Sequence, residues 1–185
     1  MNHLTYVIGV PGSGKSTAMA AATASLEASP RNPKGSPAHV LYLDHYLEVK
    51  AVQLGGLREK FSGTDALSMS VQPLAISWLS ETQWPYLVAE GDRLNNHSFY
   101  VAAMRAGYRV EIAWLDLPDE VAQQRREARG SRQDAQWLAG RVTKVKNIVG
   151  AMRDKVTRID ATQAPGVVAQ QLRLFRGFAP FNESP

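Results

Sequence analysis

The feature that most constrains this chain is residues 9–17, GVPGSGKST, which fit the pattern G-x-x-x-x-G-K-[ST]. A short apolar, β-branched run at 4–8 precedes them, and an alanine-rich run at 17–26 follows them. These runs are typical of a buried strand and a helix. Backbone amides of a glycine loop in that position can surround phosphate groups. The sequence therefore predicts a phosphate-binding loop rather than an ordinary glycine-rich turn.

Separate roles are expected within this loop. The Lys15 ammonium should reach the β- and γ-phosphates of a nucleotide, and the Ser16 hydroxyl should bind Mg²⁺. ATP and Mg²⁺ are therefore the expected cofactors. The expected phosphate-binding residues are Gly12, Ser13, Gly14, Lys15, Ser16 and Thr17.

Size and composition narrow the class of protein. A length of 185 residues suits one domain with a sizeable core. No apolar run approaches the roughly 20 residues of a membrane span, and the first strand begins too early for a signal peptide to precede it. The absence of cysteine excludes disulfides and thiolate sites. These properties favour a cytoplasmic protein without a membrane partner, and they leave the oligomeric state open.

Hydrophobic patterning predicts five strands that alternate with helices. The alternation indicates an α/β fold with a parallel sheet covered on both faces. Residues 1–176 are expected to form this single domain, residues 29–37 a loop and residues 177–185 a flexible tail. The predicted strands are 4–8, 39–43, 86–89, 108–115 and 156–160, and the predicted helices are 17–26, 46–61, 66–79, 98–106, 119–129, 135–152 and 165–175.

An arginine-rich segment follows the fourth predicted strand. Arg125 and Arg129 are spaced i, i+4 on one helix face, and a Gly-Ser break separates them from Arg132. A hinged segment at about 125–140 could fold over nucleotide phosphates, neutralise charge and exclude water. The alternative is a solvated basic helix face. We interpret the segment as a lid.

Taken together, the order of these features resembles the small P-loop kinases, the nucleoside monophosphate kinase-like and polynucleotide kinase group. The features are the P-loop, an aspartate after the second strand, an acidic cluster after the third strand and arginines after the fourth. The resemblance implies a three-layer P-loop NTPase fold and a five-stranded parallel sheet of order 2-3-1-4-5. It also implies transfer of the ATP γ-phosphoryl to a hydroxyl group.

The same resemblance implies roles for residues near the strand ends. Asp44 would accept the proton of the acceptor hydroxyl, although it could instead cap the next helix. Glu90 and Asp92 would lie near Mg²⁺. Arg93 would hold an acceptor phosphate or pair with Asp92. The remaining candidate acceptor contacts are Thr64 and Asp65, whose alternative role is a helix N-cap.

Three stretches are also similar to phage kinases of hypermodified DNA, which phosphorylate 5-hydroxymethyluracil in DNA; such a protein would work in the host cytoplasm. They are GTDALS at 63–68, EGDRL at 90–94 and GRVTK at 140–144. Between 125 and 158, ten basic residues face three acidic ones, which suits a polyanionic acceptor.

Two alternatives remain beside DNA phosphorylation. A kinase of a free nucleotide or other small metabolite would use the same loop and lid. A nucleotide-binding switch or ATPase would hydrolyse ATP without a phosphorylated acceptor. Against the switch, the chain contains no guanine-reading N-K-x-D stretch.

Overall fold

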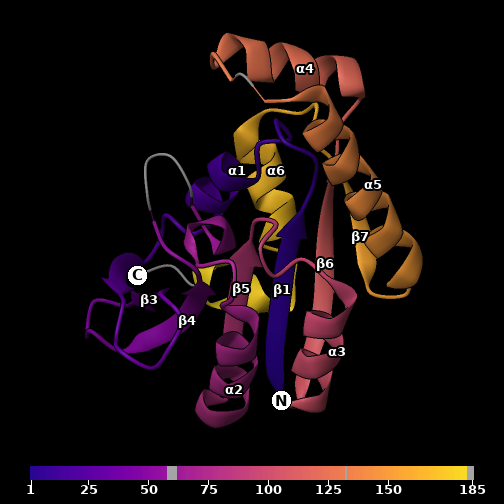
Figure 1. Cartoon of the computed structure of the whole chain (residues 1–185). Coiled ribbons are helices and arrows are strands. Elements are labelled where there is room, and N and C mark those ends of the chain that lie inside the picture. Colours follow the sequence, from indigo (N-terminus) through magenta and orange to yellow (C-terminus); the bar gives the residue numbers. More distant parts are fainter. Residues whose placement is uncertain (58–61, 132, 183–185) are drawn as a thin grey trace.

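The computed structural model describes residues 1–57, 62–131 and 133–182. Its centre is a seven-stranded sheet in the order β2-β3-β4-β5-β1-β6-β7, with helices on both faces (Figure 1). The strands are β1 (Asn2–Ile8), β2 (Glu27–Arg31), β3 (His39–Leu43), β4 (Val49–Leu54), β5 (Tyr86–Glu90), β6 (Tyr108–Asp116) and β7 (Val156–Asp160).

The sheet is mixed, so the predicted five-stranded parallel sheet of order 2-3-1-4-5 is wrong. β4, β5, β1, β6 and β7 run parallel, whereas β3 is antiparallel to both β2 and β4. The error arose at 46–61, where a helix was predicted. A short turn joins β3 to β4, and a turn of that length can only connect antiparallel strands.

β2 is a second difference from the prediction, because residues 29–31 of this strand were predicted to belong to a loop. Pro30 belongs to this strand and cannot donate a backbone hydrogen bond, which an edge strand tolerates. The parallel strand that lies beside β5 is therefore β4, and the chain reaches the carboxyl end of that strand at Leu54.

The helices are α1 (Lys15–Ala22), α2 (Gln72–Thr82), α3 (His97–Arg105), α4 (Asp119–Ala128), α5 (Ala135–Ala151) and α6 (Pro165–Leu172), with short 3₁₀ turns η1 (Thr64–Ala66) and η2 (Arg176–Asn182). Most lie close to their predicted positions. α2 begins later than predicted because Pro73 occupies its first turn. Within the described residues, no helix has the length and apolarity needed to cross a membrane.

Two hydrophobic layers cover the sheet. On one face Trp78 of α2, Tyr100 of α3 and Ile148 of α5 pack against the strands. On the other face Met19 and Leu172 bring in α1 and α6. Successive residues of a strand face opposite sides, so the central strand β1 contributes to both layers.

The predicted flexible tail at 177–185 is wrong for residues 177–182, which are packed against the sheet; residues 183–185 lie outside the described part. Phe178 and Phe181 are buried in the layer that contains α1 and α6. The Gly177 amide donates a 3.1 Å hydrogen bond to the Thr5 hydroxyl. The aromatic side chains supply apolar surface that a tail assignment based on chain position overlooked.

We expect Phe178→Ala to lower the free energy of unfolding by about 3–5 kcal/mol, since it removes a fully buried aromatic ring. Urea unfolding measures this loss. Leu174→Ala is the control, because that side chain is 83% exposed, and we expect its effect to stay within about 0.5 kcal/mol. Equal stability of the two variants would mean that the terminal segment does not pack.

Candidate active site

The glycine loop connects the carboxyl end of β1 to the first turn of α1. Gly12 and Gly14 have φ angles of 95° and 86°, in the left-handed region that favours glycine. A Cβ atom on Gly9 would lie 2.8 Å from the Leu115 carbonyl oxygen, so a side chain has no room there. The backbone conformation is therefore that of an amide loop that can surround an anion.

Lys15 curls back over this loop. Its Nζ donates hydrogen bonds to the carbonyl oxygens of Gly9 and Val10 at 2.9 and 3.3 Å. Burial lowers the pKa of the Lys15 ammonium, while the carboxylates of Glu90 and Asp65 act in the opposite direction. The Lys15 ammonium thus lies over the loop, where it can bind a phosphate group held by the loop amides.

Three oxygen-bearing side chains meet beside the first turn of α1. Ser16 Oγ donates to Glu90 Oε1 at 3.0 Å. The Ser62 hydroxyl lies 2.6 Å from Glu90 Oε1 and 2.8 Å from Ser16 Oγ. Hydroxyl and carboxylate oxygens suit Mg²⁺, which completes its shell with water and substrate phosphates. The donor set therefore fits the magnesium ion expected at Ser16 and Glu90.

Ser62 was not among the predicted site residues. Ser62 lies near Ser16 and Glu90 because the chain leaves β4 and returns beside it. Gly56 and Gly63 pair there through two backbone hydrogen bonds, from Gly56 N to Gly63 O at 3.1 Å and from Gly63 N to Gly56 O at 2.8 Å. A Cβ atom on Gly63 would lie 2.8 Å from Glu90 Oε1, so this close approach requires glycine. The only signal in the sequence was the position of Ser62 at the start of the Gly-Thr-Asp stretch.

Asp92 does not join Ser16 and Glu90, and its prediction as a magnesium ligand is not supported by its contacts. Its carboxylate forms ion pairs with Arg141 and Lys144 of α5, the second at 3.1 Å. Lys144 also donates to the Asp92 carbonyl oxygen at 2.6 Å. Two cations thus occupy the oxygens that a metal ion would need.

Thr64 and Asp65 have different surroundings. The Thr64 side chain is fully buried, and its hydroxyl lies 2.9 Å from the hydroxyl of Tyr6 in β1. Thr64 therefore anchors its turn and, contrary to prediction, is not an acceptor contact. Asp65 is partly exposed, and its Oδ1 accepts a 2.8 Å hydrogen bond from the Asp92 amide. The Asp65 carboxylate thus lies near the end of β5 and close enough to Lys15 to raise the pKa of its ammonium.

Asp44 lies at the amino ends of the parallel strands, whereas the predicted role requires it at the carboxyl ends, beside the P-loop. Because β3 is antiparallel to β4, its carboxyl end lies with the amino ends of the parallel strands. Asp44 accepts hydrogen bonds from the amides of Tyr46 and Glu48 at 2.9 and 3.0 Å, and it pairs with Lys50 at 3.1 Å. It stabilises the β3–β4 turn and cannot receive a proton beside the P-loop.

The predicted lid corresponds to the end of α4 and the start of α5, and α4 crosses above the glycine loop (Figure 1). Arg126 donates to the Pro11 carbonyl oxygen at 2.8 Å, and a Cβ atom on Gly14 would lie 3.9 Å from Arg125 Nη1. Arg129 is close enough to lower the pKa of Lys15. The structure therefore brings Arg125 and Arg129 toward the phosphate loop, whereas Arg132 lies outside the described residues.

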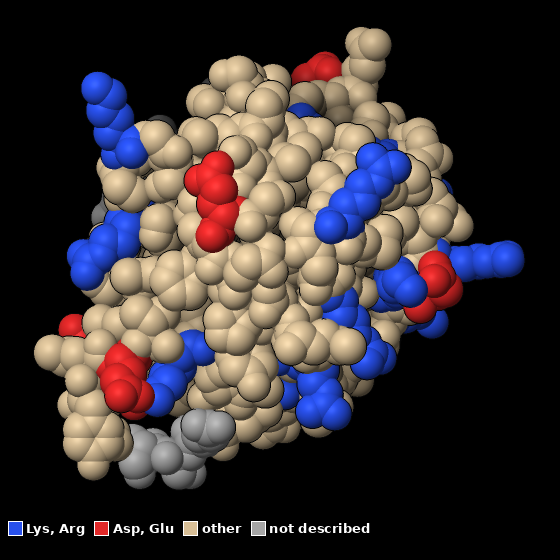
Figure 2. All heavy atoms as spheres, turned by 90° about the horizontal axis from the view of Figure 1, so that it is seen from below, with Lys and Arg blue, Asp and Glu red and all other residues tan. Residues whose placement is uncertain are grey.

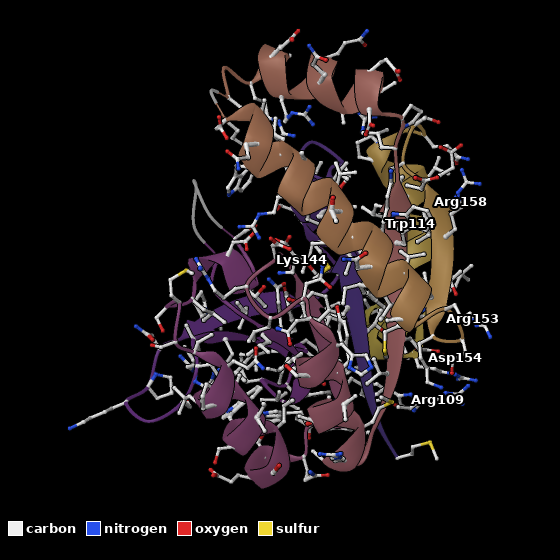
Figure 3. The ribbon with its side chains drawn as sticks, turned by 45° about the vertical axis from the view of Figure 1, so that its right-hand side comes forward. Arg109, Trp114, Lys144, Arg153, Asp154 and Arg158 are labelled. Atoms are coloured by element: carbon white, nitrogen blue, oxygen red, sulfur yellow. The ribbon has the colours of Figure 1, made fainter. Side chains whose placement is uncertain are left out.

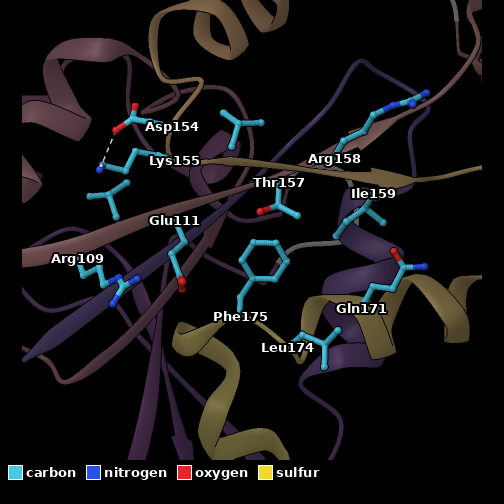
Figure 4. Close-up of a pocket in the computed structure, with 12 residues that line it drawn as sticks. Arg109, Glu111, Asp154, Lys155, Thr157, Arg158, Ile159, Gln171, Leu174 and Phe175 are labelled. Atoms are coloured by element: carbon cyan, nitrogen blue, oxygen red, sulfur yellow. Dashed lines mark ion pairs between the residues drawn. The ribbon is translucent and has the colours of Figure 1, made fainter.

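A separate cavity of about 400 Å³ opens between β6, β7 and the C-terminal end of α6 (Figure 4). Its walls include Glu111, Thr157 and Phe175, with the Asp154–Lys155 ion pair at one side. None of the predicted site residues lines this cavity, so it is distinct from the P-loop site.

The glycine loop, the Ser16–Glu90 pair and the overlying arginines define a P-loop kinase. A family model described as P-loop Nucleotide Kinase3 matches residues 1–173, and the chain belongs to that family. It is thus an ATP-dependent kinase. No similar sequence was found among curated proteins.

Two solved structures share the fold. An unliganded sugar kinase from Janibacter sp. HTCC2649 is 15% identical, with 97% of each chain covered and a TM-score of 0.54. A gluconokinase from Sinorhizobium meliloti 1021 is also 15% identical, with 96% of this chain and 91% of that chain covered and a TM-score of 0.50. At this identity the likeness shows the fold alone.

We expect Glu90→Gln to raise the Mg²⁺ concentration needed for half-maximal activity by roughly 10- to 100-fold, because it removes the charge beside Ser16. A magnesium titration of the rate of ATP-dependent transfer measures the change. Glu81→Gln, at an exposed position of α2, is the matched control and should leave the titration unchanged. An unchanged titration in Glu90→Gln would exclude this carboxylate from the metal site.

Proposed function

We propose that this kinase transfers the γ-phosphoryl group of ATP to a hydroxyl group of a small, freely diffusing acceptor. The observation that supports transfer to a hydroxyl group is the position of Asp65. This carboxylate follows the parallel strand β4, faces the P-loop side of the sheet and acts on the pKa of Lys15. A carboxylate in that position can accept the proton of an attacking hydroxyl as the phosphoryl group moves.

Each neighbouring group has a place in this reaction. Lys15, Arg125 and Arg129 would stabilise the charge of the transferring phosphoryl group, and α4 would shield it from water. Ser16 and Glu90 would hold Mg²⁺, which would supply positive charge beside the phosphate groups of ATP. The names of the two structural neighbours, a sugar kinase and a gluconokinase, also favour a small acceptor.

A hydroxymethylated base in DNA is the second candidate acceptor, and the basic run between 125 and 158 favours it. The contacts of that run weaken this argument. Arg153 and Arg158 lie at the β7 edge, apart from Lys144 (Figure 3), and Arg158 is paired with Asp116 at 2.6 Å. In the view of Figure 2, several basic side chains gather at the lower right and the others are scattered. The basic residues of this run therefore do not all lie on one part of the described structure.

Incubation with γ-labelled ATP tests the acceptor class directly. The acceptors compared would be gluconate, free nucleotides, free 5-hydroxymethyldeoxyuridine and DNA that contains 5-hydroxymethyluracil. Label on a small molecule supports the proposal, whereas label only on polymer supports the second candidate. Release of labelled phosphate without any labelled acceptor would instead indicate an ATPase.

A further inference from the structure

One tyrosine of the central strand ends beside the candidate base. Tyr6 lies near the carboxyl end of β1, and its side chain is fully buried. Its hydroxyl group donates a 3.1 Å hydrogen bond to the Gly91 carbonyl oxygen and lies 2.9 Å from the Thr64 hydroxyl. Gly91 follows β5, and Thr64 directly precedes Asp65. One hydroxyl group thus joins the two segments that surround the Asp65 carboxylate.

The direction of these hydrogen bonds follows from the groups involved. Burial raises the pKa of the Tyr6 phenol well above its usual value, while the hydrogen bond with Thr64 acts in the opposite direction, so the phenol keeps its proton. A tyrosine hydroxyl has one proton to donate, and a carbonyl oxygen can only accept. The Tyr6 proton therefore points at the Gly91 oxygen, and the Thr64 hydroxyl donates to the Tyr6 oxygen.

The peptide group between Gly91 and Asp92 is held at both of its polar atoms. Its carbonyl oxygen accepts the hydrogen bond from Tyr6, and its N–H donates to Asp65 Oδ1 at 2.8 Å. In a planar trans peptide group the C=O and the N–H point in opposite directions and cannot turn independently. Because Tyr6 fixes the carbonyl oxygen, it also fixes the direction of the amide that holds the carboxylate.

The backbone at Gly91 does not supply this restraint by itself. Its φ angle is 104°, and glycine moves readily between such a conformation and others. A Cβ atom on Gly91 would lie 2.8 Å from Thr64 Oγ1 and 3.0 Å from the Asp65 amide nitrogen, so the two segments approach this closely only because the residue is glycine. The close approach thus requires the residue that restrains the peptide group least, and the restraint comes from the Tyr6 hydroxyl.

We propose that Tyr6 is a positioning residue for phosphoryl transfer, which acts through the Gly91–Asp92 peptide group to hold the Asp65 carboxylate in place. This proposal rests on the role of Asp65 in the proposed function. Tyr6 is fully buried, so its hydroxyl does not contact the substrates and its effect passes through Asp65. Proton transfer depends on the placement of the base, whereas ATP binds at the glycine loop. Loss of the hydroxyl therefore changes kcat rather than the KM for ATP.

Tyr6→Phe removes the hydroxyl group and keeps the ring, which packs edge-on against Phe99 and Tyr100. We expect kcat to fall by about 10- to 100-fold, while the KM for ATP stays within about two-fold. Steady-state transfer from γ-labelled ATP measures both, with whichever of gluconate, a free nucleotide or DNA containing 5-hydroxymethyluracil the unmodified chain labels. Tyr42→Phe is the matched control. It removes another buried hydroxyl with two hydrogen-bonded neighbours, in the opposite hydrophobic layer, and kcat should stay within about two-fold.

A double variant separates positioning from a general loss of structure. Asp65→Asn already removes the carboxylate, so adding Tyr6→Phe to it should lower kcat by less than about three-fold more. A merely structural role of Tyr6 would lower kcat by the same factor with or without the Asp65 carboxylate. Thermal unfolding checks that each variant is folded.

Hydrogen exchange of the Asp92 amide, followed by NMR without an acceptor, tests the contact independently of turnover. The amide should exchange at least about 10-fold faster in Tyr6→Phe than in the unmodified chain or in Tyr42→Phe. The positioning role is overturned by unchanged exchange in Tyr6→Phe, by an unchanged kcat in Tyr6→Phe when Asp65→Asn is inactive, or by effects of the two substitutions that multiply. These three results leave the proposed function intact. Full activity of Asp65→Asn would overturn the proposed base as well.

Discussion

Lys15→Ala is expected to lower the rate of phosphoryl transfer by about 1,000-fold or more, which corresponds to roughly 4 kcal/mol of transition-state stabilisation. The Lys15 ammonium lies above the loop, and among the described residues it donates hydrogen bonds to the carbonyl oxygens of Gly9 and Val10. No other described residue places an ammonium within the loop, so its loss cannot be compensated locally. Single-turnover transfer from γ-labelled ATP measures the effect.

The fold should survive this change, because Lys15 contributes little to either hydrophobic layer. We therefore expect nearly unchanged thermal unfolding in Lys15→Ala. Lys34→Ala, at an exposed position between β2 and β3, is the control and should keep full activity. Near-normal transfer by Lys15→Ala would argue that the glycine loop is not where the triphosphate reacts.

Asp65→Asn should produce the second large effect. We expect kcat to fall by about 100- to 10,000-fold, while the KM for ATP stays nearly unchanged. The amide keeps the shape of the side chain, and its oxygen can still accept the hydrogen bond from the Asp92 amide. It cannot take the proton of the acceptor hydroxyl. Steady-state kinetics over a range of ATP and acceptor concentrations separate the two parameters.

Asp44→Asn is the matched control, since it makes the same change at the other carboxylate considered for this role. Asp44 belongs to the β3–β4 turn at the amino ends of the parallel strands, away from the P-loop, so activity should stay within about two-fold of the unmodified chain. If Asp44→Asn lost activity and Asp65→Asn kept it, the position of the base inferred from the strand directions would be wrong.

Much of the nucleotide side of the site was predictable because its signals are local. The P-loop spans nine consecutive residues, and its function depends on backbone amides that those residues position themselves. Glu90 is the last residue of β5 and needs only the parallel alignment of β1 and β5 to meet Ser16. Arg125 and Arg129 follow from helical spacing together with the order of the elements.

The acceptor side was less predictable because it depends on strand direction and on contacts between distant segments. Asp44 and Asp65 each follow a strand, and no local pattern distinguishes them. The distinction comes from β3, which pairs antiparallel with β4. This strand therefore ends at the amino ends of the parallel strands, away from the P-loop. Ser62 reaches Glu90 only because Gly63 allows close approach, and Arg93 loses its expected partner because α5 supplies two cations to Asp92.

The linear order of residues was thus sufficient for the phosphate loop, for most helices and for the class of reaction, since short-range sterics and periodic burial determine them. Tertiary structure alone decided which carboxylate lies at the P-loop end of the strands, which further serine contacts Ser16 and Glu90, and where the last aromatic residues pack. Those outcomes depend on contacts between strands and helices that are far apart in the sequence. The free energy of such contacts cannot be read from any single stretch.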